Sequence, residues 1–279
     1  MIYIVIPVFN RKHFTKACLL SLRKQTNQNY KAIVVDDGST DGTADMLREE
    51  FPEVDVLFGD GNLFWTASVN EGIKHALKLG AELVMTLNND VETAPDFIEN
   101  AYKWAKVKPE AVIGALEMDA ETREPIYGGE IIDFKLNKVR HMLQELPKEQ
   151  QHGIHRVSQL PGRGLLIPRV VFDRIGLFDQ NNFPHYVADY DFTHTAARAG
   201  FELYCNFDAK LYTYPEESGE RKNRKKKSIK NFYNHLFDIK GGGNLRDFTR
   251  FTLKNCPKPY IPYYLANGYA RRIFGYIIH

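Results

Sequence analysis

The run Leu83-Val84-Met85-Thr86-Leu87-Asn88-Asn89-Asp90 decides the fold, because a nearly unbroken apolar stretch stops abruptly on three polar residues. Apolar residues without alternation are typical of a parallel strand that is covered on both faces. Ligands of such sheets bind beyond the carboxyl ends of the strands. Two amides and one carboxylate at that place form a set of hard oxygen donors, which suits Mg²⁺ or Mn²⁺ carrying a diphosphate. For this segment alone, a turn with a helix cap is the alternative.

Three units of strand and helix precede this run. We expect strands over 3–8, 31–35 and 54–58, followed by helices over 14–25, 43–50 and 68–79. Strands that alternate with helices across short connections predict an α/β fold with a mainly parallel central sheet flanked by helices. The chain has neither G-x-G-x-x-G after its first strand nor G-x-x-x-x-G-K-[ST]. Neither a dinucleotide fold nor a P-loop is therefore supported.

A pair of acidic residues, Asp189 and Asp191, stands at the start of a helix expected over 193–199. A carboxylate at a helix start is often a cap or a partner of the helix dipole. Side chains at positions i and i+2 point in different directions. We therefore expect Asp189 to face a substrate, while for Asp191 a scaffold bond and a substrate contact are both open.

Charge is divided unevenly along the 279 residues. Positions 1–214 hold 23 basic and 30 acidic residues, whereas 215–279 hold 14 and 5, although the net charge of the whole chain is only +2. Hydrophobic residues at 43% and charged residues at 26% are ordinary for a soluble protein and suggest neither a disordered chain nor a polytopic membrane protein. The C-terminal fifth is therefore a basic extension on an acidic domain.

The three cysteines, Cys18, Cys205 and Cys256, are widely spaced and form no Cys-x-x-Cys pair. This usage argues against a disulfide framework or a zinc site and fits a reducing cytosol. The apolar N-terminal run is only about one strand long and follows no basic segment, so we expect a core strand there rather than a leader. No run approaches the roughly 20 apolar residues that a spanning helix needs. We expect a cytoplasmic protein.

Seven motifs follow one another in a recognisable order. They are Ile4–Asn10, Val34–Thr43, Gly61-Asn62 leading to Asn70-Glu71-Gly72, Leu87–Val91, Gly162–Pro168, Ile175–Asp179 and Ala188–Asp191. The ordered set, which covers residues 1 to about 205, resembles the family 2 glycosyltransferases with the GT-A fold. The resemblance is greatest to bacterial members of the rhamnosyltransferase-like type that act in surface-polysaccharide assembly.

This resemblance implies an inverting glycosyltransferase that moves a sugar from a UDP- or dTDP-sugar to a glycan or a lipid-linked acceptor. It also divides the chain. Residues 1–214 would form the GT-A domain, with a nucleotide-binding half over 1–110 and an acceptor-binding half over 111–214, and 215–279 would form a basic, aromatic-rich helical extension. The sugar and the linkage stay open, because the shape of the cleft selects them.

The resemblance assigns eight residues to the donor: Pro7, Asn10, Asp36, Asp37, Asn62, Asn88, Asn89 and Arg163. Asp36 would accept a hydrogen bond from N3–H of uracil or thymine, for which a short carboxylate is the right complement. Asp37 would assist at the ribose or hold the loop. Arg163, between two glycines, would approach the diphosphate or the acceptor, or else be a surface turn residue.

The run Asn88-Asn89-Asp90 occupies the place of the Asp-x-Asp metal motif, with Asp90 as the metal-binding carboxylate. Asn88 stands where the family has its first Asp, so the site carries less negative charge and would hold Mg²⁺ or Mn²⁺ more weakly. The histidine ligand that many relatives carry after the base is absent from 211–218. A divalent metal, Mg²⁺ or Mn²⁺, is expected, but from a weakened motif.

Asp189 falls where the family places its catalytic base, with Ala188 in place of the usual Glu. An inverting transfer needs one carboxylate within reach of the acceptor hydroxyl, on the face opposite the leaving diphosphate. Trp65, His185 and Asp191 are candidate contacts with the sugar or the acceptor. For Trp65, packing in the core is the alternative.

The basic run Arg221–Lys227 and the aromatic residues after it fit the edge of an anionic membrane. Packing back on the domain or on a second subunit, as in a homodimer, is the alternative. We expect no binding of nucleic acid, because no known reader motif accompanies the charge.

Two other functions stay open. A nucleotidyltransferase would need a glycine-rich basic signature near the first strand, which the turn Val8–Arg11 does not supply. A degenerate scaffold that binds glycan or nucleotide without turnover would explain the weakened metal motif. The three retained carboxylates Asp36, Asp90 and Asp189 argue against it.

Overall fold

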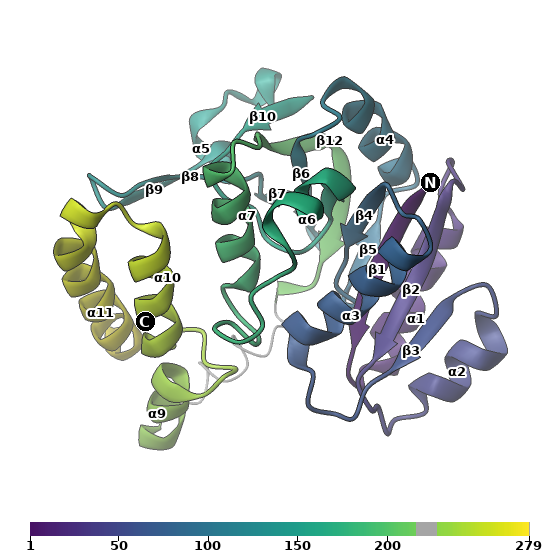
Figure 1. Ribbon diagram of the computed structural model, residues 1–279, viewed down its shortest axis with the longest axis horizontal. Coiled ribbons are helices and arrows are strands. Elements are labelled where there is room, and N and C mark those ends of the chain that lie inside the picture. The colour runs from purple at the N-terminus through teal and green to yellow at the C-terminus, as the bar shows by residue number, and fades with distance from the viewer. Residues whose placement is uncertain (216–227, 279) are drawn as a thin grey trace.

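A mixed sheet forms the centre of the molecule in the computed structural model, which describes residues 1–215 and 228–278 (Figure 1). The strand order is β10-β12-β6-β11-β4-β1-β2-β3, with β5 paired to β12 and β7 to β6. The bounds are β1 (Ile2–Val8), β2 (Tyr30–Asp36), β3 (Asp55–Phe58), β4 (Leu83–Thr86), β5 (Val91–Thr93), β6 (Val112–Asp119), β7 (Pro125–Tyr127), β10 (Ile154–Arg156), β11 (Leu165–Pro168) and β12 (Leu203–Thr213).

The first half of the sheet is parallel, as the strand and helix units predict. β1 pairs in parallel with β2 and with β4, and β2 pairs in parallel with β3. The helices that connect these strands are α1 (Lys12–Arg23), α2 (Thr43–Glu50) and α3 (Phe64–Lys78), and α4 (Phe97–Val107) precedes β6. The carboxyl ends of β1, β2 and β4 therefore meet at one edge of the sheet, where ligands of such sheets bind.

One strand inside the sheet runs against its neighbours. β11 lies antiparallel to both β4 and β6, so that its first residues meet the last residues of β4. Gly164, directly before β11, donates its N–H to the carbonyl oxygen of Thr86 at 2.9 Å. The loop over 159–164 is thereby held at the same edge as Asn88–Asp90.

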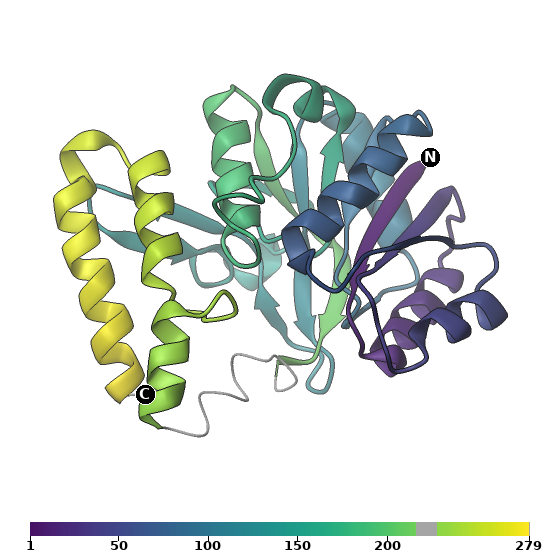
Figure 2. The same ribbon diagram turned by 60° about the horizontal axis from the view of Figure 1, so that its bottom comes forward.

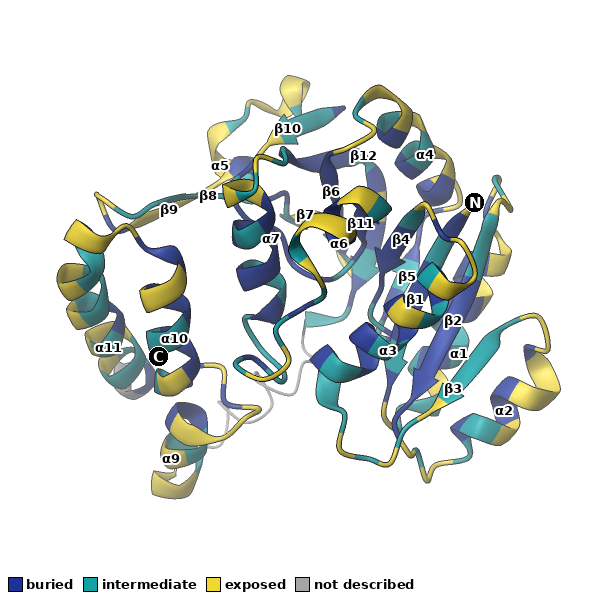
Figure 3. Cartoon of the chain, viewed as in Figure 1, coloured by how far each residue is buried: buried dark blue, intermediate teal, exposed yellow. Residues whose placement is uncertain are grey.

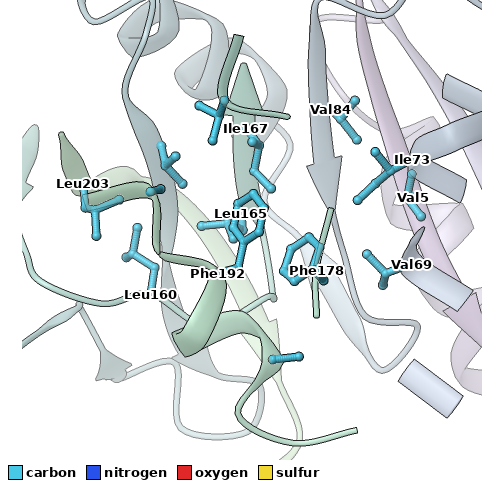
Figure 4. Close-up of a cluster of buried hydrophobic side chains, with 14 of the residues drawn as sticks. Val5, Val69, Ile73, Val84, Leu160, Leu165, Ile167, Phe178, Phe192 and Leu203 are labelled. Carbon is cyan, nitrogen blue, oxygen red and sulfur yellow. The ribbon is translucent and has the colours of Figure 1, made fainter. Parts of the chain in front are cut away.

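Both faces of the sheet are covered, which explains why the central strands are continuously apolar. Side chains of β1 alternate between the faces, because successive residues of a strand point to opposite sides. Val5 packs with Val69 and Ile73 of α3, and the cluster drawn in Figure 4 continues through Phe178 to Phe192 of α7 (Ala188–Arg198). On the other face, Ile4 packs in a cluster with residues of α1, α2 and α4. The helices bury their inner stripes and expose their outer ones (Figure 3).

The stretch 117–158, which the sequence left largely unassigned, contains β7, the hairpin β8 (Glu130–Asp133) and β9 (Lys138–His141), the short helix α5 (Met142–Glu145), and β10. The hairpin extends from the body of the protein toward the C-terminal helices (Figure 1). Phe134 packs on Tyr264 with ring centroids 5.2 Å apart, and Arg271 donates to the carbonyl oxygen of Asn137 at 3.3 Å.

The C-terminal extension is helical, as expected. It comprises α9 (Ile229–Phe237), α10 (Leu245–Asn255) and α11 (Ile261–Ile278), and α10 packs along α7 (Figure 2). The basic run 221–227 lies outside the described residues. Over 1–215 and 228–278, none of the helices combines the length and apolar character needed to cross a bilayer.

His194 of α7 lies in this helical interface. Its ring packs edge-on against Phe251 of α10, with centroids 5.3 Å apart, and only 8% of the residue is exposed. Burial lowers the pKa of His194 to about 4, and the nearby charge of Arg198 adds to this effect. The interface therefore holds the imidazole in its neutral form at neutral pH.

Acid should weaken the fold through this residue. In the unfolded chain the pKa of a histidine is about 6.5, so the unfolded state binds the proton first and the free energy of unfolding falls as the pH drops from 6.5 toward 4. We expect His194 to account for a loss of about 2 kcal/mol between pH 7.5 and 4.5. Urea unfolding across this range should show a flatter pH dependence for His194→Phe than for the wild type. The exposed His152→Phe should leave the pH dependence unchanged, and equal slopes for all three proteins would contradict the assignment.

Candidate active site

Non-glycine residues adopt left-handed backbone conformations at three turns of the carboxyl edge. The φ angles are 58° at Asn10, 64° at Arg11, 55° at Phe64 and 70° at Val187. Asparagine tolerates this region, but a β-branched residue such as Val187 is a genuine outlier there. Each such residue costs on the order of 1–3 kcal/mol and persists only where its surroundings fix it. The turns after β1, before α3 and before α7 are therefore held rigidly in place.

The turn after β2 is organised by its two carboxylates. Asp36 is 1% exposed, and its Oδ1 accepts the N–H of Ser39 at 3.0 Å. Asp37 accepts the N–H of Gly61 at 2.8 Å with one oxygen, and those of Leu63 and Phe64 at 3.0 and 3.2 Å with the other. Asp37 thus holds the loop and the start of α3, which is one of the two roles that the sequence left open for it.

Three other residues assigned to the donor lie around this turn. The N–H of Asn10 donates to Ser39 Oγ at 2.7 Å, and Asn10 Oδ1 accepts the N–H of Thr40 at 2.9 Å. Pro7 is half-buried in β1 opposite Val35. Asn62 is exposed in the loop that Asp37 holds. The structure thus brings the residues from β1, β2 and the loop after β3 to one edge.

A chain of contacts leads from Asn88 to Asp189. Trp65 Nε1 donates to Asn88 Oδ1 at 3.0 Å. The ring of Trp65 lies against Gly162, where a Cβ atom would come within 2.4 Å of it. The N–H of Gly162 donates to Asp189 Oδ2 at 2.8 Å, and Asp189 Oδ1 accepts the N–H of Tyr190 at 2.9 Å. The indole therefore fixes Asn88 and the loop that carries Gly162, so packing is a role of Trp65 that the structure supports.

Asp189 has the properties of a base. Burial raises the pKa of its carboxyl, while the hydrogen bonds from Gly162 and Tyr190 and the charge of Arg163 oppose that rise. A raised pKa makes a carboxylate a stronger proton acceptor. The strained turn at Val187 and the bond to Gly162 fix the direction in which this carboxylate points.

Glu117 of β6 was not singled out from the sequence. It is 2% exposed, its Oε2 lies 3.3 Å from Arg163 Nη2, and its Oε1 has no hydrogen-bond partner among the described residues. Burial raises the pKa of this carboxyl, while Arg163 opposes the rise. The hydroxyl of Tyr127, on the strand paired with β6, is likewise buried without a partner. A single acidic residue inside the apolar run Ala111–Met118 was the signal that could have revealed Glu117.

Arg163 pairs with Glu117 and is also influenced by the charge of Asp90. Burial tends to lower the pKa of its guanidinium, but the charges of Glu117 and Asp90 outweigh this effect and the pKa is raised. Its side chain is 39% exposed, so it also faces solvent at the edge of the sheet. Arg163 thus has a buried acidic partner, which a residue of a surface turn would not need.

The residues of the metal motif have other partners. Asp90 Oδ2 accepts from Arg11 Nη1 at 2.8 Å. The amide of Asn89 is buried and donates to Thr15 Oγ1 at 3.0 Å, and Asn88 Oδ1 is taken by Trp65. In the described part of the chain, no group of three or more His, Cys, Asp or Glu side chains is placed to hold a metal. This donor set does not fit a preformed site for Mg²⁺ or Mn²⁺.

His185 lies close to Lys240 of the C-terminal extension. Its ring packs edge-on against Phe64 at 6.4 Å, and Lys240 Nζ lies 5.7 Å from the ring centre of Phe9 and 5.8 Å from that of Phe64. Burial lowers the pKa of His185 to about 4, and the charge of Lys240 contributes to this effect. The loop between α9 and α10 thus reaches the edge of the sheet where β1 ends.

Asp191 takes the scaffold role instead of a contact with the acceptor. It is 2% exposed; its Oδ1 accepts from Asn255 Nδ2 at 2.9 Å, and its Oδ2 accepts from Lys254 Nζ at 2.7 Å. Lys254 also lies 3.1 Å from Asp179 Oδ2. The reason is geometric: two residues beyond Asp189 on the helix, the side chain points toward α10 and away from Gly162.

Removing this anchor should destabilise the protein. Asp191→Ala leaves the amide of Asn255 without its buried acceptor, whereas the partly exposed Lys254 keeps Asp179, so the change should cost about 1–3 kcal/mol. Chemical denaturation should show a loss of that order in the free energy of unfolding. The matched control is Asp173→Ala, whose partner Arg169 lies 3.6 Å away in an exposed pair, and this variant should lose less than about 1 kcal/mol. Similar losses for the two variants would contradict the scaffold role.

The sequence of the chain matches known proteins over much of its length. Residues 3–156 match the family model described as Glycosyl transferase family 2. A protein of Rickettsia typhi named uncharacterized glycosyltransferase RT0329 is 27% identical over 200 residues, which are 68% of this chain and 57% of that protein. The putative glycosyltransferase EpsH of Bacillus subtilis is 31% identical over 113 residues, which are 39% of this chain and 32% of EpsH. The chain thus spans about half the length of the first relative and a third of the second.

Solved structures share the fold. A crystal structure of residues 1–349 of TarS of S. aureus, in complex with UDP-GlcNAc, superposes with a TM-score of 0.63 at 13% sequence identity. The match covers 98% of this chain and 72% of that one. This likeness shows that the chain has the GT-A fold that the motifs predict.

Proposed function

Because the chain belongs to the family 2 glycosyltransferases, we propose that it transfers a sugar from a UDP- or dTDP-sugar to a hydroxyl group of a glycan or a lipid-linked acceptor. The observation that carries this proposal is the placement of Asp189. Its carboxylate is fixed by Gly162 and lies next to the loop that Trp65 ties to Asn88, at the carboxyl edge of β4. A carboxylate with a raised pKa at this place is suited to accept the proton of an attacking hydroxyl.

The donor would lie across the ends of β1, β2 and β4. Asp36 would bind the nucleobase: among the described residues only its Oδ1 has a hydrogen-bond partner, and a pyrimidine N3–H needs one acceptor oxygen. Asn10 and the loop that Asp37 holds would border the ribose. TarS, which shares the fold, was solved in complex with UDP-GlcNAc, and this supports a nucleotide-sugar as the donor.

The proposed reaction is a single displacement. The acceptor oxygen attacks the anomeric carbon of the sugar, the bond from that carbon to the phosphate oxygen breaks, and the nucleoside diphosphate leaves with the electron pair. Asp189 takes the proton of the acceptor hydroxyl. Attack on the face opposite the leaving group inverts the anomeric carbon, and no covalent intermediate on the enzyme is needed.

The acceptor would be reached at a membrane surface. On α9, Ile229, Tyr233 and Phe237 stand four residues apart and are 90%, 62% and 54% exposed. Such a stripe beside basic residues is typical of a helix that lies on an anionic bilayer. We propose a lipid-linked acceptor of bacterial surface-polysaccharide synthesis at the inner face of the cytoplasmic membrane.

Replacement of the base should abolish turnover without harming the fold. Asp189→Asn should lower the rate of donor hydrolysis or transfer by about 10²- to 10⁴-fold, while the Kd for the donor stays within about threefold. A screen of UDP- and dTDP-sugars by thermal shift and by release of the nucleoside diphosphate would measure both. Asp173→Asn, an exposed substitution of the same kind, should keep full activity.

The fold should tolerate this change, because a carboxyl whose pKa is raised in the folded state destabilises the protein at neutral pH. Asp189→Asn removes this cost but also one of the two N–H bonds to the carboxylate, since an amide has one acceptor oxygen, so it is expected to melt within a few degrees of the wild type at pH 7. Turnover by Asp189→Asn at the wild-type rate would contradict the role of Asp189. If no nucleotide-sugar shifts the wild-type melting temperature, the glycan-binding scaffold becomes the better hypothesis.

The membrane contact can be tested with vesicles. The wild-type protein should sediment with vesicles that contain phosphatidylglycerol and less with vesicles of phosphatidylcholine alone, and salt should weaken the binding. Tyr233→Glu combined with Phe237→Glu should reduce the bound fraction several-fold, since both carboxylates would have to enter the interface. The control Val107→Glu changes an apolar side chain of α4 that is 58% exposed. A dimer in solution that the double variant dissociates would instead assign this face to a homodimer.

A further inference from the structure

Arg11 is the residue that lies where a metal ion would be expected. Its Nη1 is 2.8 Å from Asp90 Oδ2, the carboxylate that the Asp-x-Asp motif retains. The side chains of Arg11 and Asp90 are 35% and 24% exposed, so the pair faces the edge of the sheet and is not sealed in the core. The guanidinium also lies 5.0 Å from the ring centre of Phe14. A ligand at the end of β4 would therefore meet Arg11 first.

The backbone holds Arg11 in this position at an energetic cost. Asn10 and Arg11 are consecutive left-handed residues, and both precede α1. Asn10 is bonded to Ser39 and Thr40 of the loop that follows Asp36. Strain of this kind persists where the surroundings fix it, and it concentrates at functional sites. The placement of Arg11 is thus tied to the loop proposed to bind the nucleoside.

The charges at the site balance without a metal ion. Two carboxylates and one divalent cation sum to zero, and so do the single carboxylate of Asp90 and the single positive charge of Arg11. Asn88 removes one negative charge relative to Asp-x-Asp, and its amide oxygen is bonded to Trp65. Asn89 is turned toward Thr15. The amide oxygen that replaces the first carboxylate of the motif is therefore already bonded within the protein.

An arginine can do the work that this site requires of a cation. Its planar guanidinium binds phosphate oxygens through two parallel N–H bonds and stays charged at any relevant pH. Arg163, whose pKa Asp90 helps to raise, is a second positive charge within electrostatic reach of Asp90. A diphosphate that binds beside Asp90 would therefore meet the positive charge of both arginines.

From this arrangement we infer that Arg11 takes the place of the divalent cation: it binds the diphosphate of the donor and stabilises it as the leaving group. The inference rests on the proposed function and adds to it that donor binding does not depend on Mg²⁺ or Mn²⁺. No proton moves to or from Arg11. When the diphosphate binds, the guanidinium exchanges part of its contact with Asp90 for phosphate oxygens.

Binding of UDP and dTDP, measured by calorimetry on the full chain, tests the inference without any substitution. Affinity in EDTA should lie within about threefold of the affinity in Mn²⁺, because the cation is already part of the protein. Binding that needs Mn²⁺ or Mg²⁺, with a loss of tenfold or more in EDTA, would overturn the role of Arg11 while leaving the proposed function intact. Failure of both nucleotides to bind in either condition would overturn the proposed function, and the role of Arg11 with it.

Three variants locate the effect. Arg11→Gln should weaken UDP binding in EDTA by about 10- to 100-fold, as expected for loss of charge-assisted hydrogen bonds. Binding of UMP should change far less, because it lacks the second phosphate. Arg11→Lys should recover part of the affinity. The control is Lys16→Gln, which removes a positive charge from α1, where Lys16 forms an exposed ion pair with Glu50 of α2. This variant should leave UDP binding unchanged.

Asp90→Asn separates the two mechanisms by the sign of its effect. If Asp90 holds a metal ion, the variant loses UDP binding. If Arg11 is the cation, the variant removes a negative charge near the diphosphate and the ion pair between Asp90 and Arg11, so UDP binding in EDTA stays equal or becomes tighter. A loss of tenfold or more in the UDP affinity of Asp90→Asn, in a protein that keeps the wild-type melting temperature, would overturn the inference.

Discussion

Gly162 is the point at which the structure joins its two halves. Its N–H binds Asp189 on α7, its carbonyl oxygen accepts from Thr86 Oγ1 at 2.6 Å at the end of β4, and its α-carbon lies under the ring of Trp65 on α3. No other residue type fits, because any side chain would enter the indole. Asp189, the end of β4 and the start of α3 therefore keep a fixed mutual geometry. The proposed transfer with inversion depends on such geometry, because it needs the acceptor oxygen and the leaving group on opposite faces of one carbon.

The sheet supplies the rigidity that the strained turns require. β1 is buried on both faces, and the turn that follows it can hold Asn10 and Arg11 in left-handed conformations because the strand before them is fixed. The C-terminal helices add a second support. Lys254 and Asn255 of α10 hold Asp191, which lies two residues beyond Asp189. The extension is thus part of the framework of the site, and some of its positive charge is used inside the molecule.

Local patterns in the sequence predicted much of this arrangement. The apolar run that ends at Asn88 predicted β4 and the edge at which ligands bind, and the alternation of strands and helices predicted the parallel half of the sheet. Asp189 was singled out because an acidic pair at a helix start has one member free to face a cleft. These features depend on residues close to one another in the chain, which is why a pattern can reveal them.

Other features depend on contacts between distant segments and left little trace in the sequence. The antiparallel course of β11 follows from pairing with β4 and β6, whose paired residues lie about 80 and 50 positions away along the chain. Glu117 and Arg163 form a pair only because those strands are neighbours. The orientation of Asp191 was open until α10 supplied its partners. Sequence order alone does not say which strand runs against the others.

The pairing of Arg11 with Asp90 connects the chemistry of the site with the order of its sheet. Arg11 follows β1 and Asp90 follows β4, and because these strands are parallel neighbours, residues at their carboxyl ends meet. A carboxylate at that edge needs a positive partner, because an uncompensated charge in a partly buried place is unfavourable. A divalent ion satisfies two carboxylates, whereas one guanidinium satisfies one. Asn at position 88, where the family motif has Asp, leaves one carboxylate at this edge, and Arg11 supplies the one positive charge that this carboxylate needs. The two residues meet because β1 and β4 are neighbours in the sheet.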